Sequence, residues 1–303
     1  MKAFIYRLLL FLLPIFIIAF FLEYTLQHID NDYHYKNNYL NKNAQKLEVL
    51  FLGNSHSYYG IDPTFIDKKS FNASHVSQSL AYDFEIFKKF NPKLTQLKIL
   101  AIPISYFSLH FNVENGKEAW REKNYCIYYN IFRSKKISNY FELTSNSAKT
   151  NNTILKDYFK KGKDLKKCNT LGWMLHDSIF YKKDIAKNAK RSAKRHNYTV
   201  QKNLIQNRGI LKEFIKYAKT QNFKIVLYTV PVTQKYFTLL NSKKLEQNKN
   251  EMKNLTDNQT VFYFNFLNDN RFVETDFYDA DHLNNQGAVK FSKIMNVELN
   301  TIN

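Results

Sequence analysis

The sequence predicts an α/β fold in three layers around a central parallel sheet, preceded by one N-terminal transmembrane helix. Continuous apolar runs alternate with stretches of helical spacing, which is the pattern of parallel strands that are buried on both faces. A separate apolar stretch at the start of the chain approaches the length that spans a bilayer. The 303 residues are 44% hydrophobic and 16% aromatic, so the chain can bury a sizeable core.

Four apolar runs predict the strands of this sheet, namely residues 47–52, 97–104, 223–230 and 261–266. Apolar residues at helical spacing predict helices over residues 76–90, 204–220 and 284–299. In a parallel sheet, active residues gather beyond the carboxyl ends of the strands. Ser55 and Ser105 each follow a predicted strand and are therefore expected at that edge.

The N-terminal apolar stretch, residues 8–22, predicts a retained membrane anchor. Lys2 and Arg7 precede it, and basic residues favour the cytoplasmic side of a span. A cleaved signal peptide is the alternative, but it would end in a small-x-small site, whereas the bulky residues Phe20 to Leu22 stand there. We therefore expect a single span, with the rest of the chain outside the cytoplasm, in the periplasm or at the cell surface.

The chain is expected to have three parts along its length. They are a membrane anchor over residues 1–25, a juxtamembrane spacer over residues 26–45 and an α/β domain over residues 46–303. The spacer is polar and has no clear periodicity. Within the domain, residues 111–202 interrupt the alternation and are rich in Lys, Tyr and Asn, so they are expected to form an insertion or a cap on the sheet.

The chain carries a formal net charge of +19, from 45 Lys+Arg and 26 Asp+Glu. Such an excess favours anionic partners, and composition alone does not choose between nucleic acid, acidic lipid and an acidic polymer. The expected location outside the cytoplasm argues against nucleic acid. The two cysteines, Cys126 and Cys168, form either a disulfide or two buried thiols, and their spacing supports no redox or zinc motif.

Two short segments far apart in the chain carry the candidate chemistry. Ser55 follows the first predicted strand, and Asp279 stands three residues before His282 near the C-terminus. A serine hydroxyl becomes a nucleophile when a base takes its proton, and a histidine is an effective base when a carboxylate fixes its tautomer. The structural alternatives are a strand end with a helix N-cap at the serine, and a last helix capped by Asp279 or Asp281.

Together the two segments resemble the first and last sequence blocks of the SGNH (GDSL-like) hydrolase superfamily. Gly53-Asn54-Ser55 is similar to the serine block, and Asp279-Ala280-Asp281-His282 is similar to the D-x-x-H block. The resemblance implies an SGNH-type domain in which Ser55 is the nucleophile, His282 the general base and Asp279 its orienting partner. With its membrane anchor, the chain resembles the cell-envelope branch, which includes alginate O-acetyltransferases and proteins of teichoic acid D-alanylation.

The middle blocks of that family match less well. Asn54 stands where the family usually has Asp, residues 72–75 contain no glycine, and Ser105 lies in a segment where the family has an asparagine donor. In the family these blocks supply the oxyanion hole, which stabilises negative charge on the attacked carbonyl oxygen. The candidates for the oxyanion hole or its surroundings are therefore Asn54, Ala73 and Ser105, with a backbone amide as the alternative to Ser105.

Several histidines near the two segments raise the question of a metal site. The residues concerned are His56, His75, His282 and Asp279. Their spacing fits no metal-binding motif such as HExxH, so we expect no metal and no cofactor. Tyr58 and Tyr59 are expected to line the cleft or to pack locally.

A basic run over residues 182–195 is the strongest charge feature of the chain. It predicts a helix whose thin apolar side consists of Ala186, Ala189 and Ala193. The opposite side is either a solvated helix face or a dock for an acidic glycan or anionic lipid. The basic residues of this candidate surface are Lys187, Lys190, Arg191, Lys194 and Arg195.

The resemblance implies acyl-ester chemistry on a cell-envelope carbohydrate through an acyl-enzyme on Ser55. The acyl group, with acetyl expected, would pass to a sugar hydroxyl in an O-acyltransferase or to water in an esterase. The expected partners are an envelope polysaccharide or its acyl ester, the membrane, and a membrane-bound protein that supplies the acyl donor. The alternatives are a non-catalytic envelope protein that binds an anionic polymer or lipid through its basic surface, and a basic membrane-surface tether.

Overall fold

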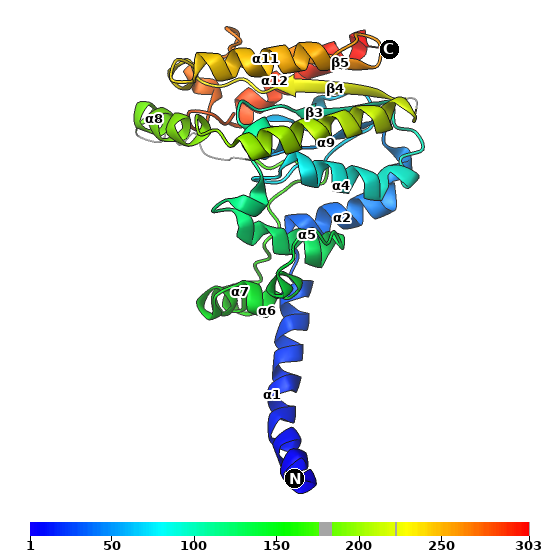
Figure 1. Ribbon diagram of the computed structural model, residues 1–303, viewed down its shortest axis with the longest axis vertical. Helices are drawn as coiled ribbons and strands as arrows, with labels where there is room; N and C mark the ends of the chain where they lie inside the picture. The colour runs from blue at the N-terminus through cyan, green and yellow to red at the C-terminus, as the bar shows by residue number, and fades with distance from the viewer. Residues whose placement is uncertain (176–183, 222, 303) are drawn as a thin grey trace. The chain divides into compact units, whose positions relative to one another are not determined.

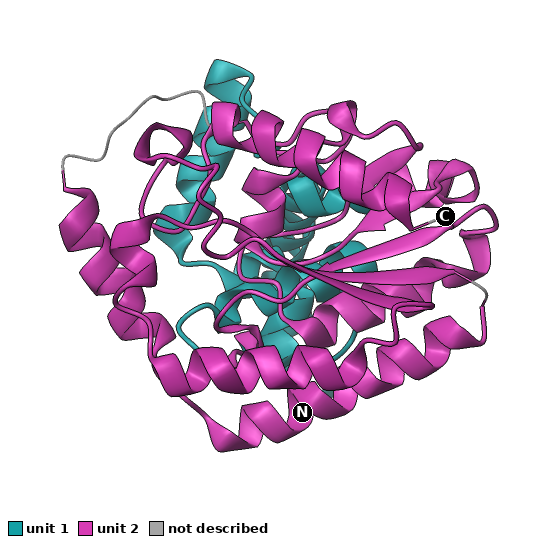
Figure 2. Ribbon diagram, turned by 90° about the horizontal axis from the view of Figure 1, so that it is seen from above, with its two compact units in different colours: residues 1–37, 114–166 teal, residues 38–113, 167–303 magenta. Residues whose placement is uncertain are grey.

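The computed structural model describes residues 1–175, 184–221 and 223–302. The chain divides into two compact units (Figure 2). Unit 1 comprises residues 1–37 and 114–166, and unit 2 comprises residues 38–113 and 167–303. Of the stretch 111–202, which is expected to form an insertion or a cap on the sheet, residues 114–166 belong to unit 1 and the others to unit 2. The domain boundaries derived from the sequence stay a prediction.

Unit 2 contains a five-stranded parallel sheet in the order β2-β1-β3-β4-β5 (Figure 1). The strands are β1 (Val49–Phe51), β2 (Ser70–Asn72), β3 (Ile99–Pro103), β4 (Lys224–Thr229) and β5 (Val261–Asn265). Four of them confirm the expected apolar runs, and the α/β class with a central parallel sheet is confirmed with them. Strand β2 was not expected, because its three residues are too few and too polar to give a strand pattern.

Helices cover both faces of this sheet and make the three layers. Side chains alternate along a strand, so every second residue faces the same way. On one face, Phe51 of β1 and Tyr228 of β4 share a buried cluster with Phe291 of α12 (Asn285–Thr301). On the other face lie α4 (Leu80–Phe90) and α9 (Gln201–Lys219) (Figure 1). The rings of Phe87 on α4 and Phe214 on α9 lie 5.7 Å apart.

The expected helices are present with shifted ends. The helix expected over residues 76–90 begins at Leu80, because Ser77 adopts a positive φ of 58° in a turn that precedes it. The remaining helices of unit 2 are α3 (Ser55–Gly60), α8 (Ile185–His196), α10 (Gln234–Phe237) and α11 (Ser242–Leu255). Short 3-10 helices occupy Ala44–Lys46, Pro63–Phe65, Asn91–Lys93, Ser108–His110, Val113–Asn115, Ala119–Arg121, Ile137–Tyr140 and Glu274–Asp276.

Unit 1 contains the long apolar helix α1 (Lys2–His28). In the described part of the chain, α1 is the helix long and apolar enough to cross a membrane, a test that a signal sequence also passes. At 1.5 Å per residue it is about 40 Å long, which exceeds the hydrocarbon core of a bilayer. The orientation of α1 and the location of the rest of the chain stay predictions. The expected spacer is largely helical, because α2 (Asp32–Asn43) fills most of it.

The other helices of unit 1 are α5 (Glu122–Tyr129), α6 (Glu142–Ser145) and α7 (Ala148–Lys161). The carboxylate of Glu23, near the end of α1, accepts hydrogen bonds from the backbone N–H groups of Glu142 and Leu143, each at 2.8 Å. The first amides of a helix have no partner within the helix, so Glu23 acts as a cap for α6. The Glu142 side chain in turn forms a buried ion pair with Lys123 of α5.

The two cysteines lie in different units, Cys126 in unit 1 and Cys168 in unit 2. The structure has them as buried thiols rather than as a disulfide. Of the two alternatives that the sequence left open, the thiols are therefore the one observed.

Candidate active site

The candidate site lies where the order of the strands reverses. From β1 the chain first adds β2 on one side and then adds β3 on the other side. Open α/β sheets bind their ligands at such a point, beyond the carboxyl ends of the strands. Ser55 follows β1 and Ser105 follows β3, so both serines lie at this edge, as the sequence predicts.

A glycine and a cap hold Ser55 in place after β1. Gly53 has a φ of +120°, and a Cβ at this position would lie 2.0 Å from Cγ of Pro103 on β3. The side chain of Asn54 is the N-cap of α3 and accepts a hydrogen bond from the His56 backbone N–H at 3.0 Å. Ser55 thus becomes the first residue of α3, with its side chain partly exposed.

Folding brings Ser55, His282 and Asp279 together in one row. The Oγ of Ser55 lies 2.9 Å from Nε2 of His282, a residue 227 positions away in the chain. The Nδ1 atom of His282 lies 3.0 Å and 3.2 Å from the two carboxylate oxygens of Asp279. A carboxylate only accepts hydrogen bonds, so the proton between them belongs to Nδ1, and Nε2 is directed at the serine.

The turn around Asp279 explains why this carboxylate is well placed. Its Oδ1 atom also accepts the backbone N–H groups of Asp281 at 3.0 Å and of His282 at 2.9 Å. The alternative that Asp279 or Asp281 caps the last helix is wrong, because Asn284 is the N-cap of α12 and accepts from Gly287 N–H at 3.0 Å. Asp279 is therefore available to the imidazole.

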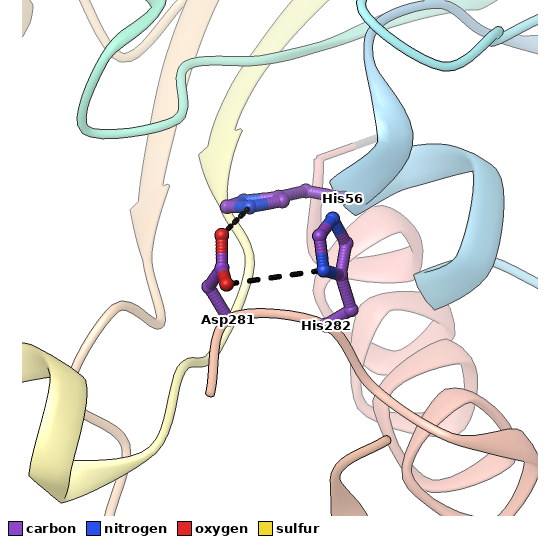
Figure 3. A group of neighbouring side chains, drawn as sticks. All are labelled: His56, Asp281 and His282. Carbon is purple, nitrogen blue, oxygen red and sulfur yellow. Dashed lines mark ion pairs between the residues drawn. The ribbon is translucent and has the colours of Figure 1, made fainter. Parts of the chain in front are cut away.

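A second carboxylate, Asp281, lies among three histidines. Its oxygens are 3.6 Å from Nε2 of His56 and 3.9 Å from Nδ1 of His282, the two contacts drawn in Figure 3. Nδ1 of His196 lies 3.7 Å away. Asp281 is only 1% exposed, and neither of its oxygens has a hydrogen-bond partner among the described residues. Nothing in the sequence indicates this arrangement, since His196 comes from α8 and only the fold brings it close to Asp281.

The two carboxylates set the charge state of His282. Burial lowers the pKa of His282, and the positive charge of Arg195 lowers it slightly further. The negative charges of Asp279 and Asp281 outweigh both effects and raise the pKa to about 9. Burial raises the pKa of Asp279, and the neighbouring His282 more than reverses this, so the carboxyl is ionised. At neutral pH the resting site therefore holds an imidazolium between two carboxylates.

The other two histidines of the cluster are neutral at neutral pH. Burial lowers the pKa of His56, and burial lowers the pKa of His196 to about 3. Burial also opposes ionisation of Asp281, but His282 and then His56 hold its pKa well below the usual range. The cluster thus keeps one buried negative charge at Asp281.

Three of these side chains lie close enough to be tested as a metal site. The ligand atoms of His56, Asp281 and His282 all lie within 4.8 Å of one another. Both ring nitrogens of His282 are already engaged, however, by Asp279 on one side and Ser55 on the other. A cation bound at Nδ1 would displace Asp279, so the residues present fit a hydrogen-bonded site better than a metal centre.

The structure corrects one of the three candidates for the oxyanion hole. The Ala73 N–H donates to the carbonyl of Phe51 at 2.8 Å, which continues the pairing of β1 with β2, so it cannot also serve an oxyanion. The hydroxyl of Ser105 is 1% exposed and lies within hydrogen-bonding distance of Asn54 and His56. The amide N–H of Ser55 has no partner among the described residues, as expected at the first position of a helix.

Two tyrosines follow Ser55 on α3 and differ in role. The ring of Tyr59 lies 5.4 Å from that of His282 and nearly perpendicular to it, and it is partly exposed. Its carbonyl accepts from the indole N–H of Trp173 at 2.8 Å. Tyr58 is buried and packs against Tyr59. Tyr59 therefore lines the site, whereas Tyr58 packs locally.

Helix α8 presents the expected basic face and adjoins the active segment. Ala189 and Ala193 are buried in one cluster with Ala280, whereas Ala186 is exposed, contrary to expectation. The Asn188 side chain accepts from the Ala280 N–H at 3.2 Å. All five candidate residues of the basic surface are exposed: Lys187, Lys190, Arg191, Lys194 and Arg195. Lys182 and Lys183 of the expected run lie outside the described residues.

Comparison with known proteins finds distant likenesses to this chain. No family model matches it. No curated protein matches it either. Solved structures that resemble it include a candidate acylhydrolase from Bacteroides fragilis, with a TM-score of 0.42, 11% identity, and 88% of this chain and 96% of that chain covered.

Two further structures are similar to the same degree. A GDSL-like lipase from Bacteroides thetaiotaomicron has a TM-score of 0.41, 12% identity, and coverage of 89% of this chain and all of that chain, 100%. A protein named as a candidate platelet activating factor from Streptococcus pneumoniae has a TM-score of 0.41, 12% identity, and coverage of 96% and 99%. At these TM-scores the likeness is too distant to carry an argument about family or activity.

Proposed function

We propose that this chain is a serine-dependent acyl-ester enzyme of SGNH type, with Ser55 as nucleophile, His282 as general base and Asp279 as its orienting partner. One observation carries the proposal. Two segments separated by 227 positions place a partly exposed serine hydroxyl 2.9 Å from an imidazole whose other nitrogen is bonded to a carboxylate. Nucleophile, base and orienting group within hydrogen-bonding reach are the signature of covalent acyl transfer.

The reaction follows from the order of the three groups. Neutral His282 takes the proton of the Ser55 hydroxyl at Nε2 while Oγ forms a bond to the ester carbonyl carbon. The protonated imidazole then gives this proton to the leaving alcohol oxygen as the ester bond breaks, which leaves an acyl-enzyme on Ser55. Water or a sugar hydroxyl resolves the acyl-enzyme by the same two steps, with His282 again moving the proton.

Charge on the carbonyl oxygen needs donors close to Ser55. The Ser55 N–H is the first helical amide of α3 and is the donor that the geometry supports best. The Asn54 side chain is the neighbouring candidate, because it has two N–H bonds and only one is needed for Ser105. Loss of one such donor typically reduces kcat about 10²–10³-fold.

We further infer that the acyl acceptor or donor is a cell-envelope carbohydrate, and that the enzyme works as an O-acyltransferase or an esterase there. The apolar helix α1 supports attachment to a membrane, outside which such polymers occur. The exposed basic face of α8 supports an anionic polymer, since α8 packs against Ala280 of the active segment. A membrane-bound protein that supplies the acyl donor completes this scheme, and nucleic acid has no part in it.

The core proposal is tested with the full-length protein in detergent micelles. We expect hydrolysis of small aryl acetates and labelling by a fluorophosphonate probe, and loss of both in Ser55→Ala. Ser57→Ala is the matched control, because Ser57 lies on the same helix but its hydroxyl is buried and bonds Tyr228 at 2.8 Å. Activity and labelling that survive in Ser55→Ala would overturn the proposal and favour the non-catalytic binding protein.

A second experiment addresses the carbohydrate. Addition of oligosaccharide acceptors to the aryl acetate assay yields an acylated sugar if the enzyme is a transferase, and only free acid if it is an esterase. Reversal of charge at Lys187 and Arg191 to Glu is expected to raise KM for an anionic polysaccharide and to leave KM for the aryl acetate unchanged. Equal effects on both substrates would show that the basic surface does not bind the polysaccharide. If the protein is instead a basic membrane-surface tether, Ser55→Ala should leave its biological function intact.

A further inference from the structure

We propose that Asp281, His56 and Ser105 form a buried positioning relay that holds the Asn54 side chain, and with it the turn that presents Ser55. This inference rests on the proposed function, since it assigns a role in the same reaction. None of the three residues reaches the space beside Ser55: they are 1%, 3% and 1% exposed. They act on the reaction through Asn54 and are positioning residues rather than catalytic ones.

The relay begins at the buried charge of Asp281. A carboxylate that has lost its water must be compensated by donors, and an uncompensated one is costly. Three imidazoles face Asp281. The nearest ring nitrogen is Nε2 of His56, which lies 3.6 Å from a carboxylate oxygen of Asp281. Nε2 of His56 has no hydrogen-bond partner among the described residues, so Asp281 is the acceptor available to it.

The charge of Asp281 favours one direction for the hydrogen bonds that follow it. Although 3.6 Å is too long for a hydrogen bond, the negative charge attracts the ring proton to Nε2 of His56, and Nδ1 of the neutral ring is then the acceptor. Nδ1 lies 3.1 Å from Oγ of Ser105, so the Ser105 hydroxyl donates to it. The Ser105 oxygen is then left to accept, and it accepts from Nδ2 of Asn54 at 3.1 Å. Oδ1 of Asn54 also lies 3.3 Å from the Ser105 oxygen, but the hydroxyl proton is already directed at His56 over the shorter distance.

The last step of the relay sets which way the Asn54 amide faces. With Nδ2 directed at Ser105, the Oδ1 atom faces α3 and accepts the His56 N–H at 3.0 Å, which is the cap of the helix. A flipped amide would point N–H groups at the helix N-terminus and lose that cap. The relay therefore keeps the Ser55 N–H and the second N–H of Asn54 in a fixed position relative to the nucleophile.

The relay is also what ties the two halves of the site together. His56 follows Ser55 directly, while Asp281 precedes His282 directly. The His56 and His282 rings lie edge to face, 5.1 Å apart at 90°. A change at either end of the relay thus reaches both the nucleophile and the base.

The test compares two buried serines. Ser105→Ala removes the middle of the relay, and Ser57→Ala removes a buried hydroxyl of α3 that bonds Tyr228 instead. For aryl acetate hydrolysis by the full-length protein, we expect kcat to fall about 10- to 100-fold in Ser105→Ala with KM changed less than about twofold, because positioning acts on the transition state. Ser57→Ala should keep both values within about twofold of the parent protein.

A double-mutant cycle separates a relay from a loss of packing. In a relay, His56→Ala and Ser105→Ala remove the same effect, so the double variant should lose about as much kcat as the worse single variant. Losses that multiply, or a Ser105→Ala variant equal to Ser57→Ala, would overturn the proposal. So would one equivalent of metal bound to the purified protein and lost in His56→Ala. Ser55→Ala that retains activity would instead end the proposed function itself, and the two failures are therefore distinguishable.

Discussion

Asp281 and His282 are adjacent in the chain, and their side chains face each other across 3.9 Å without a hydrogen bond. The same imidazole nitrogen bonds Asp279 at 3.0 Å. One carboxylate therefore fixes the position of the ring, while the other acts on it through space. At neutral pH this pair of charges favours the imidazolium, which is the form that cannot take a proton from Ser55.

The first prediction concerns the pH dependence of the reaction. Because the pKa of His282 is raised to about 9, the neutral base becomes abundant only as the pH approaches that value. We expect kcat/KM for aryl acetates to rise steadily from pH 6 to about pH 9 and then to level off. Initial rates over this range, corrected for spontaneous hydrolysis, measure the profile. A plateau already reached at pH 7 would contradict it.

The second prediction assigns part of that shift to Asp281. Asp281→Asn removes one of the two charges that raise the pKa of His282, so the rising limb should move to lower pH. The same variant keeps an acceptor oxygen but lacks the charge that sets the His56 tautomer, and its NH2 group can face Nε2 of His56 instead, so its highest rate should fall below that of the parent protein. An unchanged pH profile in a folded Asp281→Asn variant would show that the charge does not reach the base.

The third prediction concerns Asp279. Asp279→Asn keeps the size of the side chain but lets an amide face Nδ1, which favours the wrong tautomer of His282. We expect kcat to fall about 10²–10⁴-fold, with a small change in KM. Asp62→Asn is the control, because the Asp62 side chain caps the turn Pro63–Phe65 by accepting from Thr64, which an asparagine also does. A comparable loss of kcat in Asp62→Asn would indicate that both variants are impaired in folding, and would contradict a specific role of Asp279.

The fourth prediction tests the turn before Ser55. Gly53→Ala forces a left-handed φ on alanine and drives its Cβ into Pro103. We expect a loss of at least about 2 kcal/mol in the free energy of unfolding, together with lost activity. Gly209→Ala is the matched control, because Gly209 lies in α9 and a Cβ added there would meet nothing within 4 Å beyond its own helix. This change should stabilise the protein by about 0.5–1 kcal/mol. Urea unfolding of both variants measures the difference.

The fifth prediction is a pH-dependent stability effect at Asp83 of α4. Burial raises the pKa of Asp83 to about 7, although Gln78 donates to it at 2.6 Å. Because this pKa lies above the unfolded value near 4, the folded protein binds the proton more tightly, and stability falls as the pH rises through 7. Asp83→Asn should therefore raise Tm more at pH 8.5 than at pH 5. Equal changes in Tm at both values would contradict the assignment.

Local patterns in the sequence predict the parts of this molecule that depend on local physics. The apolar runs that became β1, β3, β4 and β5 are recognisable because strands buried on both faces have no polar alternation. Strand β2, Ser70–Asn72, forms because it pairs in parallel with β1, and its own side chains do not show a strand pattern. Helix α4 starts later than its apolar spacing suggests, since the turn at Ser77 overrides that spacing.

The candidate site divides in the same way. Ser55, Asp279 and His282 stand in two compact segments, so their chemistry could be predicted before their distances were known. The surroundings of Asp281 could not, because His196 reaches it from α8 through packing between distant segments. Ala73 failed as a donor for a related reason: its amide is consumed by pairing with Phe51 in an extension of the sheet.

The carboxylate of Glu23 has a practical consequence for anyone who produces this protein. It belongs to the apolar helix α1, yet it holds the first two amides of α6. A recombinant fragment trimmed to remove every residue of α1 would expose those amides and leave the Lys123–Glu142 pair on an unsupported turn. Expression boundaries are better set upstream of residue 23, even where solubility argues for a shorter fragment.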